Sequence, residues 1–355
     1  MSGPHSAGDL IGGRYEILGD AGEGGMQYVY AAKDHVLKRQ VALKTPKNDS
    51  ARKRFQRSAI VSARVTHPNV AKTLDYVDDG QRQYLVEELI AGTDLDKALL
   101  VRTPHLDPYL AARIFHHLAK GLAASHHAGV VHRDLKPSNV MVTGGYQLDA
   151  IKITDFGIAK MADEEIAEAV EGGGESISAS RTVVGALPYM APEAIETPRE
   201  VGKSADVWSI GAMMYELLTG NVPYGKGLQA VTKIIAAAPP EFPGFMTANP
   251  QFATLSKQLI QIVLQCLQKD PATRPTADTL VEQCGMLCYP VEPRFLGYVR
   301  EIRHRAWGFV VVDDEDVFFH FDCVYGDKPV LGDNVMLSKF RGGGAWRALP
   351  VVKMQ

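Results

Sequence analysis

The chain has 355 residues, of which 46% are hydrophobic and 22% are charged, and its formal net charge is −3 at pH 7. This composition fits a globular protein and excludes wholesale disorder, while the length favours two domains. The small negative charge excludes attraction of the whole molecule to nucleic acid, so any such binding has to come from a local patch. No stretch approaches the ~18 apolar residues of a membrane span, and we expect neither a span nor an apolar signal region.

The four cysteines of the chain are too few for a disulfide scaffold. Cys284 and Cys288 have helical i, i+4 spacing, but no second pair of metal ligands follows them. We therefore interpret them as core thiols rather than a zinc site, and expect a reducing, cytoplasmic compartment.

The first segments combine a flexible start with a glycine-rich hairpin. Residues 1–13 are small and polar and are expected to be flexible, and residues 14–18 are predicted to form a strand. Residues 22–30 read GEGGMQYVY, and glycines let backbone N–H groups approach phosphates closely. The next predicted strand ends in VALK, which places Lys44 at its end.

A helix without acidic residues comes next. Residues 52–65 have a helical pattern that is basic at its start, and no Asp or Glu occurs between Asp49 and Asp75. Strands are predicted at 70–77 and 83–89, on either side of an Asp-Asp-Gly turn.

The centre of the chain carries its densest polar motif. A helix is predicted over 108–127, with Ile114, Leu118 and Leu122 on one face. We expect its histidines to lie on a solvated face; they are His116, His117, His126 and His127. Residues 132–139 read HRDLKPSN between two apolar runs, which indicates a loop held by buried strands.

These motifs resemble those of eukaryotic-type protein kinases, in their bacterial serine/threonine form. HRDLKPSN resembles the catalytic loop H-R-D-L-x-x-x-N, and the hairpin and VALK resemble G-x-G-x-x-G-x-V and V-A-I-K. DFG at 155–157 and GALPYMAPE at 185–193 resemble the next two signatures. The resemblance covers residues 14–288 and implies an α+β, bilobal kinase fold, with ATP bound between a small β-rich lobe and a large helical lobe.

The resemblance also implies a role for each matching residue. Asp134 would orient the substrate hydroxyl, Lys136 would neutralise the transferring phosphoryl group, and Lys44 would pair with the ATP phosphates. Mg²⁺ would be held by Asn139 and Asp155. Further ATP contacts would come from Gly22, Gly24, Val29, Ala42, Glu87, Glu88, Ile90, Asp94 and Met141.

The region after DFG resembles an activation loop. Its candidate phosphosites are Ser176, Ser178, Ser180 and Thr182. A phosphate there would pair with Arg133. The family pattern further implies that Asp206 braces the catalytic loop and that Arg274 pairs with Glu193.

Four positions depart from the kinase pattern. Gln27 replaces the third glycine of the hairpin, which should stiffen it, and Ala186 replaces a threonine on the substrate side. Ser58 stands where kinases place the glutamate that holds the lysine, and Glu87 occupies the usually apolar gatekeeper position. Our hypothesis is that Glu87 supplies the anion for Lys44 that Ser58 cannot. A register shifted by one residue, with Glu87 pointing outward, is the open alternative.

The last part of the chain changes to short alternating strands. Residues 289–294 are predicted as a linker and 295–355 as a small five-stranded OB-type β-barrel. The expected strands are 295–302, 308–313, 316–321, 334–340 and 346–352. RAWGFV at 305–310 and DVFFHF at 316–321 resemble the two nucleic-acid motifs of cold-shock domains.

This second resemblance implies a platform for single-stranded RNA or DNA. Its members would be Trp307, Phe309, Phe318 and His320, because aromatic faces stack on bases. Glu301 and Ile302 replace a usual aromatic pair, and residues 313–316 are acidic. The alternatives are that the aromatics form the barrel core, or that the barrel binds protein or regulates the kinase.

Taken together, the motifs favour an ATP- and Mg²⁺-dependent serine/threonine kinase that acts on protein substrates, with no contact to a membrane. The intact set of Lys44, Asp134, Asn139 and Asp155 supports activity. A pseudokinase scaffold is the alternative, favoured by Gln27, Ser58 and Ala186. A small-molecule kinase is disfavoured by the APE motif and Asp206, which are typical of protein kinases.

Overall fold

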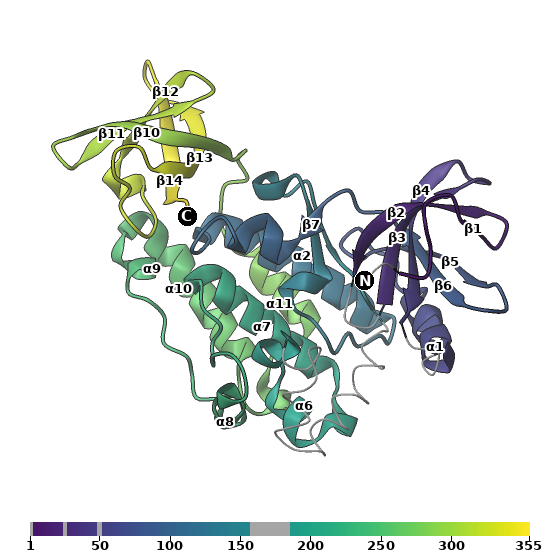
Figure 1. The fold of residues 1–355 in the computed structure, drawn as a ribbon. Helices are drawn as coiled ribbons and strands as arrows, with labels where there is room; N and C mark the ends of the chain where they lie inside the picture. The colour runs from purple at the N-terminus through teal and green to yellow at the C-terminus, as the bar shows by residue number, and fades with distance from the viewer. Residues whose placement is uncertain (1–2, 24–26, 48–51, 157–184) are drawn as a thin grey trace.

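The computed structural model describes residues 3–23, 27–47, 52–156 and 185–355. Figure 1 shows the β-rich small lobe on the right, a small barrel on the upper left, and the helices of the large lobe between and below them. The predicted α+β class is therefore confirmed.

The small lobe is a six-stranded sheet with the order β1-β2-β3-β4-β6-β5. Its strands are β1 (Leu10–Ile11), β2 (Tyr15–Glu23), β3 (Gln27–Asp34), β4 (Arg39–Pro46), β5 (Thr73–Asp78) and β6 (Gln83–Glu88). Helix α1 (Arg52–Ser62) contacts β5 and β6 and ends before the predicted boundary. One face of the sheet buries an apolar cluster around Tyr30, Leu43 and Val86, so the alternate residues of these strands face the large lobe.

The large lobe is built around two buried helices, α2 (Pro108–His127) and α7 (Lys203–Thr219). The other helices are α6 (Pro192–Glu196), α8 (Gln229–Ala236), α9 (Phe245–Ala248), α10 (Pro250–Cys266) and α11 (Ala277–Gly285). A small sheet of β7 (Thr93–Asp94), β8 (Val140–Thr143) and β9 (Ala150–Ile153) lies beside α2. Of the helices in the described ranges, none has the length and apolar character to cross a membrane.

Helix α2 has the boundaries that the sequence predicts, but its histidines are not all exposed to solvent as predicted. Asp107 caps its N-terminus by accepting hydrogen bonds from the backbone N–H groups of Tyr109 and Leu110. The prediction that its histidines are solvated is wrong for His126, which is buried and lies 2.9 Å from the carboxylate of Asp206. His117 is also engaged, with Asn69.

The C-terminal strands form a closed barrel with the order β10-β11-β12-β14-β13, which confirms the five predicted strands. They are β10 (Phe295–Arg303), β11 (Trp307–Val312), β12 (Glu315–His320), β13 (Asn334–Arg341) and β14 (Trp346–Lys353). The interior is filled mainly by aliphatic side chains, including Val299, Val310, Val317, Leu337 and Val351, together with Phe319.

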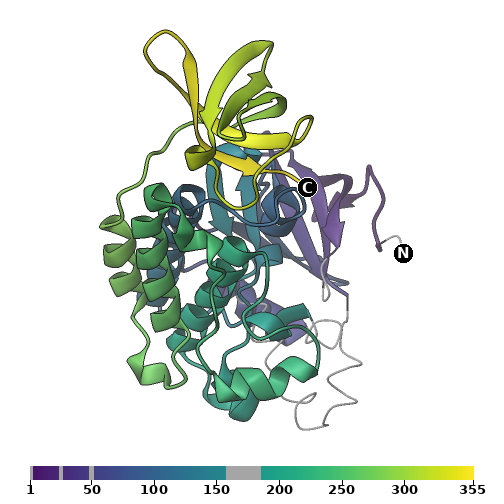
Figure 2. The same cartoon turned by 90° about the vertical axis from the view of Figure 1, so that its left-hand side faces the viewer.

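The barrel packs on the large lobe through a shared apolar core. Tyr325 is 1% exposed and its ring packs edge-on against Phe245 and Phe252, which belong to α9 and α10. Met336 and Val352 join the same core cluster. Figure 2 shows the barrel seated on this end of the large lobe. Burial of this kind restrains the barrel far more than a linker alone would.

A buried ion pair ties the two parts together at the same junction. Arg294, immediately before β10, donates to the Asp107 carboxylate at 2.9 Å, and both side chains are buried. Gln147 adds hydrogen bonds to the backbone of Arg294. The residue that caps α2 is therefore also the anchor of the barrel.

We predict that Arg294→Met destabilises the whole chain. Removing one partner of a buried ion pair leaves an uncompensated charge at Asp107, which costs about 3–5 kcal/mol. Urea unfolding followed by circular dichroism measures this loss. The matched control is Asp278→Asn, which breaks the exposed pair with His127 and should cost at most about 1 kcal/mol. Equal losses in the two variants would contradict the anchoring role.

Candidate active site

The strand register of the small lobe brings the candidate nucleotide residues onto one face. Val29 of β3 lies opposite Lys44 of β4, and Ala42 of β4 lies opposite Glu87 of β6. Paired residues and residues two apart share a face of a sheet. Glu87 and Lys44 are therefore diagonal neighbours on the face toward the large lobe, and the alternative of a shifted register is wrong.

Lys44 is held between two carboxylates. Its Nζ lies 2.6 Å from Oε2 of Glu87 and 2.9 Å from Oδ1 of Asp155. Lys44 is 6% exposed and Glu87 is 3% exposed, so the pair is shielded from water. The predicted contact between Glu87 and Lys44 is confirmed, and it is made by a strand residue rather than by helix α1.

The charges of this cluster do not balance among themselves. Burial alone would lower the pKa of Lys44, but Asp155 and Glu87 outweigh it and raise that pKa. Burial raises the pKa of Glu87, and Lys44 offsets this only in part. Burial also acts to raise the pKa of Asp155, yet the Lys44 ammonium dominates and lowers it. Two carboxylates around one ammonium leave an excess negative charge, which suits a bound cation.

Gln27 extends the same cluster from the hairpin. Its Nε2 donates to Oδ1 of Asp155 at 2.8 Å, across 128 positions of sequence. The sequence indicated only that Gln27 replaces a glycine. The alternation of side chains along β3 could have placed Gln27 on the nucleotide face of the sheet, because Gln27 lies two residues before Val29 and therefore shares its face.

The catalytic-loop motif is braced from below by helix α7. The Asp206 carboxylate accepts hydrogen bonds from the backbone N–H groups of His132 and Arg133, at 2.8 and 2.7 Å. Arg133 has a φ of 67°, a strained conformation that persists only where the surroundings fix it. The bracing role predicted for Asp206 is confirmed by these contacts.

Within the loop, polar side chains converge on Asp134. Lys136 Nζ lies 2.9 Å from Oδ2 of Asp134. Asn139 Nδ2 donates to the backbone oxygen of Asp134 at 2.7 Å and to its Oδ2 at 3.0 Å. Nε2 of His132 donates to the backbone carbonyl oxygen of Thr154 at 2.8 Å, which links the loop to the strand before Asp155. The structure thus brings together the residues of the two motifs.

The oxygen atoms around Asp155 fit a hard divalent cation. The amide nitrogen of Asn139 is occupied by Asp134, which leaves its carbonyl oxygen as the remaining acceptor. Oδ1 of Asp155 accepts hydrogen bonds from Lys44 and Gln27. Oδ2 accepts only a long hydrogen bond, from the hydroxyl of Thr154 at 3.3 Å, among the described residues. Carboxylate and amide oxygens are the ligands that Mg²⁺ prefers.

Strand pairing relates several of the other predicted nucleotide residues to one another. Asp94 of β7 pairs with Met141 of β8, and β6 ends at Glu88, two residues before Ile90. Gly22 lies opposite Val29 in the β2–β3 hairpin. Gly24 and the candidate phosphosites (Ser176, Ser178, Ser180 and Thr182) lie outside the described residues.

The remaining large-lobe motif is held by a structural ion pair. Arg274 donates to both carboxylate oxygens of Glu193, at 2.6 and 2.8 Å. The predicted pairing of these residues is confirmed. Ala186, near the start of the motif that contains Glu193, is buried as well.

Three aromatic residues of the barrel face outward. Trp307, Phe309 and Phe318 are partly exposed, and their ring centroids lie 5.8 to 6.0 Å apart. The alternate residues of the same strands fill the interior, so the interpretation of these three as barrel core is wrong. Arg303 lies over Trp307 and Arg300 over Phe309, and the two guanidinium groups are paired with the carboxylates of Glu301 and Asp316.

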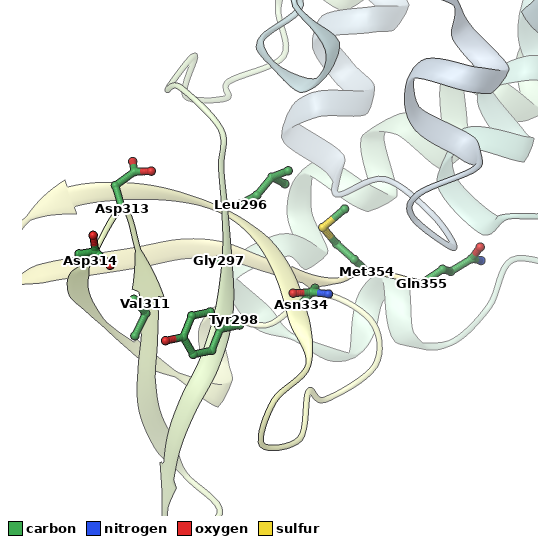
Figure 3. Close-up of a pocket in the computed structure, with 9 residues that line it drawn as sticks. All are labelled: Leu296, Gly297, Tyr298, Val311, Asp313, Asp314, Asn334, Met354 and Gln355. Atoms are coloured by element: carbon green, nitrogen blue, oxygen red, sulfur yellow. The ribbon is translucent and has the colours of Figure 1, made fainter.

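A pocket of about 440 Å³ continues the outer face toward the large lobe. Figure 3 shows Asp313 and Asp314 on one side of it and Met354 and Gln355 on the other. The face of the barrel therefore changes from aromatic at Trp307 to acidic at this pocket. Asp316 is neutralised in part by Arg300, at 2.8 Å.

Comparisons with known proteins agree with this geometry. The family model described as Protein kinase domain matches residues 15–284, which end before the barrel. Serine/threonine-protein kinase PrkC of Bacillus subtilis is 32% identical over 272 residues, covering 75% of this chain and 39% of that protein. Serine/threonine-protein kinase PkaA of Streptomyces coelicolor is 37% identical over 231 residues, covering 64% and 38%. The chain thus spans about two fifths of the length of these relatives.

Proposed function

The chain belongs to the protein kinase domain family, and we propose that it transfers the γ-phosphoryl group of ATP to serine and threonine hydroxyls of protein substrates. The observation that carries this proposal is the buried pair of Lys44 and Glu87, at 2.6 Å. It supplies the lysine anchor that the residues of α1 do not. The bacterial serine/threonine kinases among its relatives favour the same reaction and acceptor.

In this proposal the chain's own residues position the reactants. Lys44, fixed by Glu87, binds the α- and β-phosphates, and Asp134 accepts or orients the proton of the attacking hydroxyl. Lys136 offsets charge on the transferring group from beside Asp134. Phosphoryl transfer needs alignment and charge stabilisation more than covalent help, so these fixed contacts account for most of the expected rate.

The nucleotide and metal complete the site. Backbone groups of Glu88 and Ile90 contact adenine, Asp94 holds the ribose, and Ala42 and Met141 enclose the base. Bound Mg²⁺ would supply positive charge to the phosphates, held by Asn139 and Asp155. A phosphate on one of the candidate sites between 176 and 182 would pair with Arg133 and order the substrate side.

For the barrel, residues 295–355, we propose binding of single-stranded RNA or DNA through a cold-shock-like platform. The supporting observation is the outward cluster of Trp307, Phe309 and Phe318, with Arg300 and Arg303 over its rings. Stacking on aromatic rings beside basic groups is the sequence-tolerant mode of single-strand recognition. The acidic pocket beyond it limits the bound strand to the aromatic end of the face.

The first prediction concerns phosphotransfer itself. Purified chain incubated with labelled ATP, Mg²⁺ and casein as acceptor should incorporate label, and Asp155→Asn should lower the rate by roughly 10²–10³-fold, as expected for loss of a charge-stabilising group. Absence of label on the wild type with either Mg²⁺ or Mn²⁺ would contradict the proposal and favour a pseudokinase scaffold.

A second prediction tests the anion that holds Lys44. Glu87→Met should lower phosphotransfer roughly 10- to 150-fold, because a hydrogen bond to a charged group contributes about 1.5–3 kcal/mol. Adding Ser58→Glu, which restores the usual kinase residue, should recover part of the rate. Gln83→Met is the matched control, since Gln83 lies on the same strand and face as Glu87. Undiminished transfer by Glu87→Met would show that Glu87 has no such role.

A third prediction concerns the barrel. Fluorescence anisotropy with labelled oligo(U) and oligo(dT) should detect binding, and Phe309→Ala or Phe318→Ala should each cost about 1–3 kcal/mol of binding free energy. Leu331→Ala is the control, because this exposed side chain lies in the loop before β13 and not on the strands that carry the platform. If the wild type fails to bind at low salt, or all three variants bind alike, the platform is not a nucleic-acid site.

A further inference from the structure

The side chain of Gln27 enters the nucleotide site at a place where the kinase pattern has no side chain at all. Gln27 begins β3, directly after the hairpin, and lies on the same face as Val29 and Lys44. It is only 6% exposed. A glutamine at this position therefore introduces one amide into the space beside Asp155.

The orientation of this amide is set by its partner. Nε2 of Gln27 lies 2.8 Å from Oδ1 of Asp155. A carboxylate can only accept hydrogen bonds, so the nitrogen has to face Asp155 and the carbonyl oxygen has to face elsewhere. Lys44 donates to the same Oδ1 at 2.9 Å, which fixes the carboxylate from a second side.

The carbonyl oxygen of Gln27 is left without a partner. Oε1 is buried, and no hydrogen-bond donor contacts it among the described residues. A buried oxygen in this state destabilises the site unless a ligand satisfies it. The surroundings are those of a cation site, with Asp155 adjacent and an excess carboxylate in the cluster of Lys44, Glu87 and Asp155.

We propose that Gln27 is a residue of the metal site, with Oε1 binding the divalent cation of the nucleotide complex, directly or through one of its waters, while Nε2 holds Asp155. The inference rests on the proposed function, since the cation is the one that accompanies ATP. An amide oxygen is a hard ligand of the type that Mg²⁺ and Mn²⁺ accept. The replacement of the glycine then adds a ligand to the site rather than obstructing it.

The proposal is tested by metal affinity, measured without turnover. The full chain is held with saturating ADP, and Mn²⁺ is titrated while the electron paramagnetic resonance signal of the free ion is recorded. Gln27→Met keeps the length of the side chain and removes both polar atoms, Gln27→Gly restores the kinase pattern, and Gln27→Glu keeps an oxygen. Tyr28→Phe is the control, because Tyr28 is the next residue of β3 and faces the opposite side of the sheet.

We expect Gln27→Met and Gln27→Gly to weaken Mn²⁺ binding on the order of 10-fold, the lower end of the effect of removing a supporting metal contact. Tyr28→Phe should bind Mn²⁺ within about twofold of the wild type. Gln27→Glu should bind Mn²⁺ within about twofold of the wild type or more tightly. Unchanged or tighter binding by both Gln27→Met and Gln27→Gly would overturn the proposal, the tighter result meaning that the amide obstructs the metal.

A parallel titration with a fluorescent ADP analogue separates this inference from the proposed function. If the wild type binds the analogue and Mn²⁺ and the Gln27 variants match it, only the role of Gln27 is wrong. If the wild type binds no nucleotide, the proposed kinase function is wrong, and the inference is overturned with it.

Discussion

The ammonium group of Lys44 is buried between the carboxylates of Glu87 and Asp155, and the geometry of the nucleotide site depends on this contact. A buried lysine without an anion would lose its charge or open its surroundings to water. In the kinase pattern a helix residue supplies the anion, whereas here a strand residue of the same sheet does so. Because β4 and β6 are hydrogen-bonded neighbours, the pair is built into the sheet and needs no movement of α1 to form.

The same principle, that a buried charge has to be paired, organises the rest of the molecule. Asp206 holds the backbone of the catalytic loop, Arg274 holds Glu193, and Arg294 holds the cap of α2. Each pair joins segments far apart in the sequence. Removing one partner of such a pair lowers the free energy of unfolding by more than the pair itself contributes, because the remaining charge stays buried without a partner. The barrel is joined to the large lobe by such a buried pair, between Arg294 and Asp107, and not by the chain connection alone.

Much of the site could be predicted because its information is local. The octet at 132–139 and its neighbours at 155–157 have fixed spacings. The face of Glu87, by contrast, follows from the alternation of side chains along β6 only once the register of β6 against β4 is known. The burial of His126 could also have been predicted, since it continues the i, i+4 stripe of Ile114, Leu118 and Leu122. The contact of Gln27 with Asp155 could not, because it depends on how the two lobes sit relative to each other. The pair of Arg294 and Asp107 could not be predicted either, because it depends on how the barrel packs against the large lobe.

The ion pair of Glu87 is tested most directly by following its carboxyl group. Carbon-13 NMR of glutamate-labelled protein, with the resonance assigned by its loss in Glu87→Gln, gives the titration of this group in the wild type and in Lys44→Met. Burial raises the pKa of Glu87 and Lys44 opposes that rise, so removal of the ammonium should raise the pKa further. An unchanged titration in Lys44→Met, in the ordinary range of a glutamate, would contradict the account.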